Sequence, residues 1–347
     1  MNNQIKFESI SHLNNYWENL YKIGPGLRNL GNTCFMNSVL QCITHTPLLV
    51  NYLLSNLHAC QKKQCIICVV QKHVKQCFSN NSNNIIAPSE IINNMKYINK
   101  NFRLGKQHDS HEFLRFLLEA MQKSYFIDIK KQKILEEQTP IFNIFGGKLI
   151  SQIQCFSCKQ ISQNIETFYD LLLECKQNID QSFESFFKKE ILSGNNKYRC
   201  SFCKNLVDCS KGYVIQKFPN ILTIQLKRFN NFMMKVNKHT QFAPTINLKK
   251  YSTNQKDQIY DLYGILIHVG HDLNYGHYYC YTKSPNKQWY CMNDSSVNQV
   301  SFQEVQNEKA FLLFYSKREE KKKKEEINNP EEESVTQQIS KQQEKFN

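Results

Sequence analysis

The spacing of the apolar residues changes once along the chain, and this change restricts the possible folds. In "HEFLRFLLEAMQ", Phe113, Phe116, Leu117, Ala120 and Met121 recur at helical spacing. The second half contains "ILTIQLKRF", "YGILIHVG", "HYYCYTK", "QWYCMND" and "AFLLFY", which are rich in β-branched and aromatic residues and separated by Gly, Asn and Pro. Such segments are typical of strands. Helices followed by a run of strands predict an α+β protein with a cleft between the two parts.

The 347 residues divide into three segments by composition. We expect a lead-in over residues 1–22, one globular domain over 23–317 and a disordered charged tail over 318–347, which has few large apolar residues. No window has eighteen uncharged apolar residues, so we expect no membrane span. The first residues, "MNNQIKFESI", lack the apolar stretch of a secretory signal. We therefore expect an intracellular protein, in the cytoplasm, the nucleus or both.

The net charge of +14 lies in the globular part of the chain. From Lys317 onward, eight Lys and Arg residues balance eight Glu residues. The remaining lysines are scattered and do not form a basic stripe. We therefore do not expect nucleic acid as a specific ligand.

Two CxxC pairs stand 41 residues apart: "CFSC" contains Cys155 and Cys158, and "CSFC" contains Cys200 and Cys203. In a reducing compartment two such pairs are typical of a tetrahedral zinc site. Four thiolates fill the coordination shell, so the zinc would be structural. The long spacing predicts that the pairs lie at the tips of two hairpins. From the residues alone, a redox pair or buried apolar cysteines remain alternatives.

The segment "CQKKQCIICVVQKH" could hold a second zinc ion. Cys60, Cys65, Cys68 and His73 follow the spacing C-x4-C-x2-C-x4-H, which would supply three sulfurs and one nitrogen. The alternative is a helix that buries Cys68 among apolar neighbours and exposes His73. His73 lies about one and a half turns beyond Cys68, so a helix would point its ring partly away. The sequence predicts one structural zinc ion and leaves a second open.

Cys34, in "GNTCFMN", is either a buried apolar residue or a nucleophile. At a helix start, the positive end of the helix dipole would favour its thiolate. His277, in "NYGHYYCY", is a candidate base; Gly276 would let the backbone turn just before its strand. Asn293 and Asp294 end the next strand, which can pair antiparallel with the first, and either could orient the imidazole. Such thiol chemistry needs no catalytic cofactor.

Several segments together resemble the ubiquitin-specific proteases, a family of papain-like deubiquitinases. "GLRNLGNTCFMNSVLQC" and "YGHYYCY…WYCMNDSSV" resemble the family's cysteine and histidine boxes, and "GKQHDSHEFLRFLLEAMQ" resembles the acidic box between them. The CxxC pairs match the zinc site of the family's fingers, and "FPNILTIQLKRF" resembles a further strand motif. The likeness runs in the expected order from about Gly24 to Ser316. "QHDSHEFL" and "MNDSSV" resemble the branch with nucleolar, histone-linked and ribosome-linked members.

The resemblance implies a hand-like fold with a helical thumb, a β-rich palm and zinc-clipped β fingers over about residues 148–215. It implies a thiol-dependent deubiquitinase that cleaves the peptide or isopeptide bond after the C-terminal glycine of ubiquitin. The implied partners are ubiquitin and ubiquitinated proteins, and we expect a monomer.

The resemblance also implies roles for single residues. Cys34 would be the nucleophile and His277 the general base. Asn293 falls at the position that orients the histidine, which many relatives fill with Asp. Asp294 matches a family acidic position and could share that role or hold a water on the oxyanion side. Asn29 matches the amide of the oxyanion hole, in which the Cys34 backbone N–H would be the second donor.

Asp109 and Glu112 match the acidic box, which contacts the tail of ubiquitin and braces the cleft. Asp109 could instead be only the N-cap of the helix that follows it. Two other classes of function remain as rivals: a catalytically silent ubiquitin-binding scaffold and a zinc-dependent nucleic-acid module. The intact set of candidate catalytic residues argues against the first. The second leaves the cysteine and histidine boxes unexplained.

Overall fold

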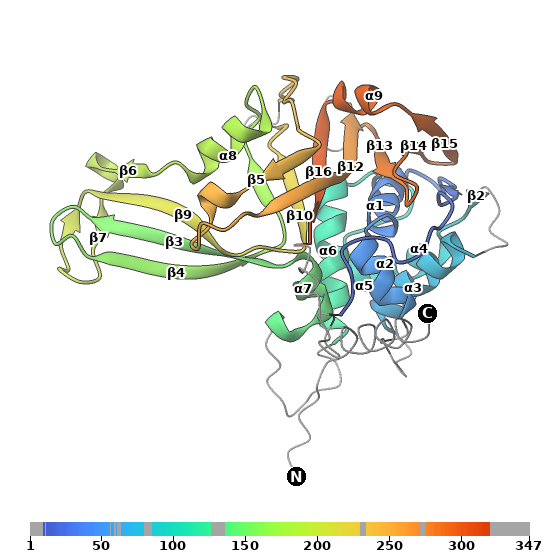
Figure 1. Cartoon of the computed structure of the whole chain (residues 1–347), viewed down its shortest axis with the longest axis horizontal. Helices are drawn as coiled ribbons and strands as arrows, with labels where there is room; N and C mark the ends of the chain where they lie inside the picture. Colours follow the sequence, from blue (N-terminus) through green and yellow to red (C-terminus); the bar gives the residue numbers. More distant parts are fainter. Residues whose placement is uncertain are drawn as a thin grey trace, which may run out of the picture.

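A group of helices, a central β-sheet and a long β-arm make up the structure, with the arm extending away from the helices (Figure 1). This computed structural model describes residues 10, 12–55, 57–58, 60, 64–79, 85–125, 136–229, 234–270 and 275–319. The predicted tail lies outside the described residues from 320 onward, as does much of the lead-in. The α+β class predicted from the sequence is confirmed.

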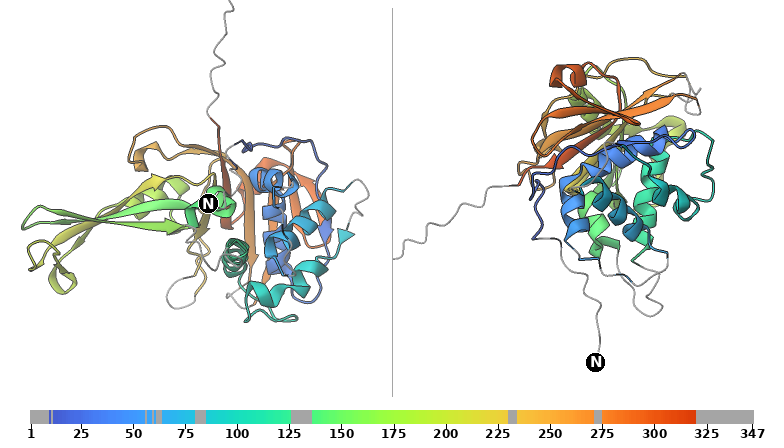
Figure 2. Two further views of the ribbon diagram at one scale, coloured as in Figure 1. Left: turned by 90° about the horizontal axis from the view of Figure 1, so that it is seen from below. Right: turned by 90° about the vertical axis from the view of Figure 1, so that its right-hand side faces the viewer.

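The first half of the chain is mainly helical, as the apolar spacing predicts. Its helices are α1 (Cys34–Thr44), α2 (Pro47–Leu54), α3 (Ile66–Cys77), α4 (Ser89–Asn93), α5 (Met95–Ile98), α6 (Ser110–Lys123) and α7 (Pro140–Phe145). A short parallel pair joins β1 (Gly26–Leu27) to β2 (Ile85–Ile86). The right-hand view of Figure 2 shows these helices together on one side of the orange and red strands.

Helix α1 occupies the centre of the fold. Each of its residues is buried, and it packs on α6 and on the sheet. The predicted apolar stripe of α6 supplies the contact: Phe113 and Leu117 are fully buried, and the Phe113 ring lies edge-on to Phe35 at a centroid distance of 5.6 Å. This packing fixes the first turn of α1, which begins at Cys34.

The central sheet has the strand order β15-β14-β13-β12-β16-β10-β5, with β11 also paired to β12. Its strands include all those predicted from the second half. They are β5 (Leu171–Leu173), β10 (Ile221–Leu226), β11 (Thr245–Asn247), β12 (Ile259–Val269), β13 (His277–Lys283), β14 (Trp289–Asn293), β15 (Ser296–Val300) and β16 (Ala310–Lys317). Helix α9 (Phe302–Gln306) connects β15 to β16.

The arm is a four-stranded sheet in the order β4-β3-β9-β6. Its strands are β3 (Gly147–Cys155), β4 (Ile161–Phe168), β6 (Glu190–Leu192) and β9 (Cys209–Lys217), and a small hairpin of β7 (Tyr198–Arg199) and β8 (Leu206–Val207) lies at its far end. The arm occupies the region where the sequence places the fingers.

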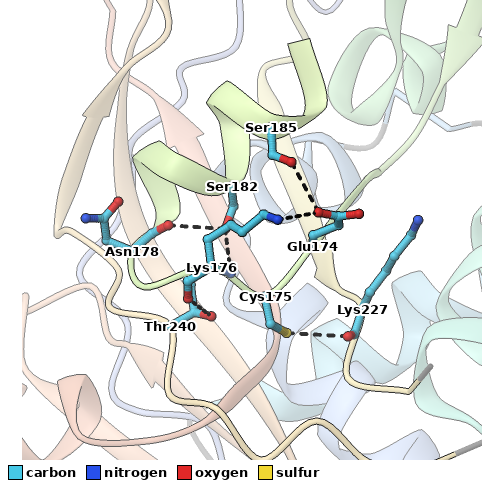
Figure 3. A network of polar contacts seen from close by, with 8 residues as sticks. All are labelled: Glu174, Cys175, Lys176, Asn178, Ser182, Ser185, Lys227 and Thr240. Carbon is cyan, nitrogen blue, oxygen red and sulfur yellow. Dashed lines mark hydrogen bonds and ion pairs between the residues drawn. The ribbon is translucent and has the colours of Figure 1, made fainter. Parts of the chain in front are cut away.

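Polar contacts hold α8 (Ile179–Phe187) against the central sheet, as Figure 3 shows. Asn178 caps the helix by accepting from the Gln181 backbone N–H at 2.9 Å. Ser185 Oγ donates to Glu174 Oε2 at 3.1 Å, just after β5. Thr240 Oγ1 donates to the Lys176 carbonyl at 2.9 Å. These bonds attach α8 to the end of β5 and to the loop ahead of β11.

A membrane crossing would need a long apolar helix, and none occurs among the described helices.

Candidate active site and metal centres

The thiol of Cys34 lies at the N-terminus of α1, behind a turn that the Asn29 side chain closes. Asn29 Oδ1 accepts from the backbone N–H groups of Gly31 at 3.1 Å and Thr33 at 3.0 Å. Gly31 (φ 104°) and Asn32 (φ 56°) both adopt the left-handed conformation, which glycine and asparagine tolerate best. Cys34 is 3% exposed. The turn therefore delivers a nearly buried sulfur to the positive end of the helix dipole.

His277 begins β13, and its ring is held by Asn293 at the end of β14. Its Nε2 lies 2.7 Å from Asn293 Oδ1. The two strands pair antiparallel, with Cys280 opposite Met292. In this register Asn293 faces the position two residues after His277, so the side chains of Asn293 and His277 lie on the same face of the sheet. The predicted pairing of these strands is confirmed.

The pKa of His277 is raised to about 9. A hydrogen bond with the Cys34 side chain is the largest cause; burial opposes it, while Asn293 and the negative charges nearby raise the pKa further. The imidazole is therefore hydrogen-bonded on one side to the thiol and on the other to an amide oxygen. These contacts favour a protonated ring beside the sulfur at neutral pH.

Asp294 has different partners from its neighbour. It adopts a left-handed conformation, with φ of 46°, in the turn between β14 and β15. Its carboxylate accepts from Asn29 Nδ2 at 2.9 Å and from Asn37 Nδ2 at 2.8 Å. The structure thus brings Asn293 to the histidine and Asp294 to the amides beside the cysteine. Asn37, which is buried in α1, was missed by the sequence analysis.

The glycine before His277 serves a different purpose from the predicted one. A Cβ at Gly276 would lie 2.3 Å from His268 Nε2 and 2.5 Å from the Val269 carbonyl oxygen, and its φ is not left-handed. Close approach, and not turning, requires glycine here. Its N–H donates to Gln107 Oε1 at 2.9 Å. Gln107 thus joins the segment before α6 to the histidine strand, a contact that the sequence analysis missed.

Asp109 is the N-cap of α6, so the structural role considered above is observed. Its Oδ1 accepts from the Glu112 backbone N–H at 2.8 Å. Burial raises the pKa of the Asp109 carboxyl. The side chain of Glu112 is exposed in the first turn of the same helix. Contact of either residue with ubiquitin stays a prediction.

The two CxxC pairs meet at the far end of the arm. The sulfurs of Cys155, Cys158, Cys200 and Cys203 lie within 4.8 Å of one another. Cys158 and Cys200 are separated by 3.7 Å between sulfurs, close to the about 3.8 Å that tetrahedral geometry and Zn–S bonds of about 2.3 Å imply. Backbone N–H groups of Cys158 and Phe202 point to the sulfurs of Cys155 and Cys200, both at 3.4 Å. The set can hold a metal ion.

Each CxxC pair belongs to a hairpin, as predicted. Cys155 ends β3 and Cys158 lies in the turn to β4. Cys200 and Cys203 lie in the turn between β7 and β8. A metal ion held by both pairs would clip the two hairpin tips together.

A second group of possible metal ligands differs from the predicted set by one residue. His58, Cys60, Cys65 and Cys68 have their ligand atoms within 4.8 Å of one another. His73 does not join them, and that prediction was wrong. It lies in α3, is 2% exposed and has its Nε2 3.6 Å from Cys77 Sγ. The helix turns His73 away from Cys68 and into the core.

His58 was missed although the sequence carried a signal for it. It stands two residues before Cys60, in "HAC", so the segment reads H-x-C-x4-C-x2-C. A histidine ahead of the cysteines is as acceptable a ligand as one behind them, because zinc requires only the donor set and its geometry.

Comparison with known proteins identifies relatives over most of the chain. The family model "Ubiquitin carboxyl-terminal hydrolase" matches residues 25–315. Human ubiquitin carboxyl-terminal hydrolase 42 is 40% identical over 86% of this chain, but over only 23% of its own length. Ubiquitin carboxyl-terminal hydrolase 25 of Arabidopsis thaliana is 40% identical over 84% of this chain and 47% of its own length. The chain thus spans less than half the length of these two relatives.

A further relative and a solved structure are matched over more than two thirds of their own lengths. The probable ubiquitin carboxyl-terminal hydrolase 16 of Schizosaccharomyces pombe is 40% identical, covering 86% of this chain and 68% of its own. A chain in the structure of the SAGA Ubp8/Sgf11/Sus1/Sgf73 DUB module bound to ubiquitin aldehyde superposes with a TM-score of 0.74 and 33% identity, covering 85% of this chain and 70% of that one. The predicted resemblance is confirmed: this chain belongs to the ubiquitin carboxyl-terminal hydrolase family.

Proposed function

We propose that the chain is a thiol-dependent deubiquitinase, which hydrolyses the peptide or isopeptide bond after the C-terminal glycine of ubiquitin. The observation that carries the proposal is the chain of contacts from Cys34 to His277 to Asn293, built on α1, β13 and β14. The solved structure bound to ubiquitin aldehyde supports ubiquitin as the substrate.

The reaction begins with the sulfur of Cys34. Its thiolate attacks the carbonyl carbon of the terminal glycine and forms a tetrahedral oxyanion. His277, protonated at neutral pH because its pKa is about 9, gives its proton to the leaving amine as the C–N bond breaks. The product is a thioester. Water then attacks that carbonyl, His277 accepts its proton, and the C–S bond breaks to release the carboxylate of ubiquitin.

Asn293 positions the base. Its Oδ1 accepts from Nε2 of His277, which leaves Nδ1 for exchange of the proton with Cys34. An amide fixes the ring orientation as a carboxylate would, but it adds no negative charge to stabilise the imidazolium. The negative charge that acts on the ring comes from Cys34 and from Asp294.

Asn29 stabilises the oxyanion in this proposal. Its Oδ1 is occupied by the turn, and one N–H of its amide donates to Asp294. The second N–H remains for the substrate, together with the backbone N–H of Cys34 at the start of α1. Because Asp294 fixes the amide before the substrate arrives, the donor needs no reorganisation during the reaction.

Asp109 and Glu112 supply negative charge near the path of the ubiquitin tail. Glu112 is exposed at the start of α6, and the preceding segment contacts Gly276 through Gln107. This contact connects the acidic box with the histidine strand. We assign Glu112 to direct contact with the tail and Asp109 to both capping and contact.

The four cysteines at the end of the arm bind one structural zinc ion. Their sulfur separation and the N–H groups that point to them support this assignment. No disulfide joins any of the fourteen cysteines, all of which lie among the described residues, and we infer a reducing, intracellular location. That the protein acts as a monomer stays a prediction, which sedimentation of the purified chain would check.

A ubiquitin C-terminal propargylamide probe tests the proposed function. The wild-type chain should form a covalent adduct with one ubiquitin, and Cys34→Ser should form none while still binding ubiquitin, because serine keeps the size but lacks thiolate reactivity. Cys175→Ser, a half-buried thiol away from the site, is the matched control and should label like wild type. A folded wild-type chain that stays unlabelled, or an adduct that survives Cys34→Ser, would contradict the proposal.

A further inference from the structure

A histidine and three cysteines converge in the connection between α2 and α3. The described part of this connection includes His58 and Cys60, while Cys65 is the residue immediately before α3 and Cys68 lies in its first turn. Cys60 and Cys68 are only half-buried, unlike cysteines that serve as apolar core residues. Burial alone therefore does not explain why four such side chains meet.

We propose that His58, Cys60, Cys65 and Cys68 form a second, structural zinc site. Their ligand atoms lie within 4.8 Å of one another. His58 Nε2 is 3.2 Å from Cys65 Sγ, near the about 3.6 Å that tetrahedral zinc with one nitrogen and three sulfurs implies. Three thiolates with an imidazole favour zinc over hard cations such as Mg²⁺ or Ca²⁺. Four protein ligands fill the shell, so the ion would not activate water.

The site would attach the α2–α3 connection to the end of α6. The Ile66 backbone N–H, at the start of α3, donates to Ser124 Oγ at 3.2 Å. The His58 ring lies edge-on to Tyr125 at a centroid distance of 6.1 Å, and the Tyr125 hydroxyl hydrogen-bonds to that of Tyr52 on α2. Three helices thus meet around the ligands. A metal ion would hold them where helix α3 has no side-chain N-cap.

This site is separate from the one in the arm. Helices α2 and α3 lie within the helical group, whereas the tips that carry Cys155 and Cys200 lie at the opposite end of the molecule (Figure 1). The ligands of the two sites come from different elements, and removal of one ion should leave the other bound. The two zinc ions can therefore be counted independently.

Metal analysis of the purified full chain tests the site. We expect about two zinc ions per wild-type chain, about one in His58→Ala, about one in Cys200→Ser and none in the double variant. His73→Gln is the matched control: it changes the buried histidine of α3 and should retain both ions. One zinc ion in the wild type, two in His58→Ala, or the loss of one in His73→Gln would each overturn the proposal.

X-ray absorption at the zinc edge tests the site without any substitution, in case His58→Ala fails to fold. One four-sulfur site and one three-sulfur, one-nitrogen site average to about three and a half sulfurs and half a nitrogen per zinc ion. Four sulfurs and no nitrogen would overturn the proposal. Neither readout depends on catalysis, so failure of the zinc site and failure of the deubiquitinase assignment are distinguishable.

Discussion

At the residue scale, two adjacent residues at the end of β14 have separate roles. Asn293 accepts from the imidazole of His277, whereas Asp294 accepts from the amides of Asn29 and Asn37. The left-handed conformation of Asp294 makes this possible, because it turns the second side chain away from the direction of the first. The proposed base and the proposed oxyanion donor are thus each positioned by one residue of the same turn.

Substitution of Asn293 should change both the rate and its pH dependence. In wild type, kcat/KM on a fluorogenic ubiquitin amide should fall as pH rises through about 9, where His277 loses the proton that the leaving amine needs. Asn293→Ala removes a contact that raises this pKa, so the alkaline fall should move to lower pH. Asn293→Asp adds a negative charge and should move it to higher pH.

The alanine variant should also lose a factor on the order of 10²–10⁴ in kcat, because the ring is no longer oriented. The aspartate variant retains an oxygen at that position and should recover most of the rate. A pH profile that is the same in all three proteins would show that Asn293 does not act on His277.

Local patterns account for most of the elements, and the limits of prediction lie in contacts between distant segments. The apolar stripe of α6 and the strand β13 occur where the sequence places them, because burial of one face determines each pattern. His58, and not the predicted His73, lies with the cysteines, because the fold and not the spacing decides which histidine faces them. The contact between Gln107 and Gly276 joins residues 169 apart and has no local signature.

Substitution of Asp109 can separate its two roles at the start of α6. Asp109→Ala should lower the free energy of unfolding by about 1 kcal/mol, because the Glu112 N–H loses its acceptor. Asp109→Asn keeps an acceptor oxygen and should restore stability. It should not restore KM for ubiquitin substrates if the charge contacts the tail, as we propose.

Thermal unfolding and steady-state kinetics on the same preparations check this prediction. Glu112→Gln, which removes an exposed charge without touching the cap, is the control and should raise KM at unchanged stability. Full recovery of KM in Asp109→Asn would show that Asp109 acts as a cap alone.

At the scale of the whole molecule, the proposed catalytic site and the proposed zinc site of the arm are far apart. The proposed catalytic residues lie where α1 meets β13 and β14, whereas the four cysteines lie at the end of the arm (Figure 1). Strand β3 pairs with β4 and β9 along its length, from Lys148 opposite Lys217 to Cys155 opposite Cys209. Pairing holds the base of the arm. We expect its tips to depend on the proposed zinc ion, because their small hydrophobic cluster is composed mainly of the cysteines themselves.

Loss of the proposed zinc ion of the arm should therefore weaken substrate binding more than it slows the chemical step. In the double variant Cys200→Ser and Cys203→Ser, amide hydrogen exchange should rise in the tips of β3, β7 and β8 and stay unchanged in α1 and β13. KM for ubiquitin substrates should rise on the order of tenfold, about 1.4 kcal/mol, while kcat changes little. His58→Ala is the matched control, since it removes the other proposed ion and should leave exchange in the arm unaltered. A fall in kcat at unchanged KM, or faster exchange spread equally through α1, would mean that the tips and the catalytic residues form one cooperative unit.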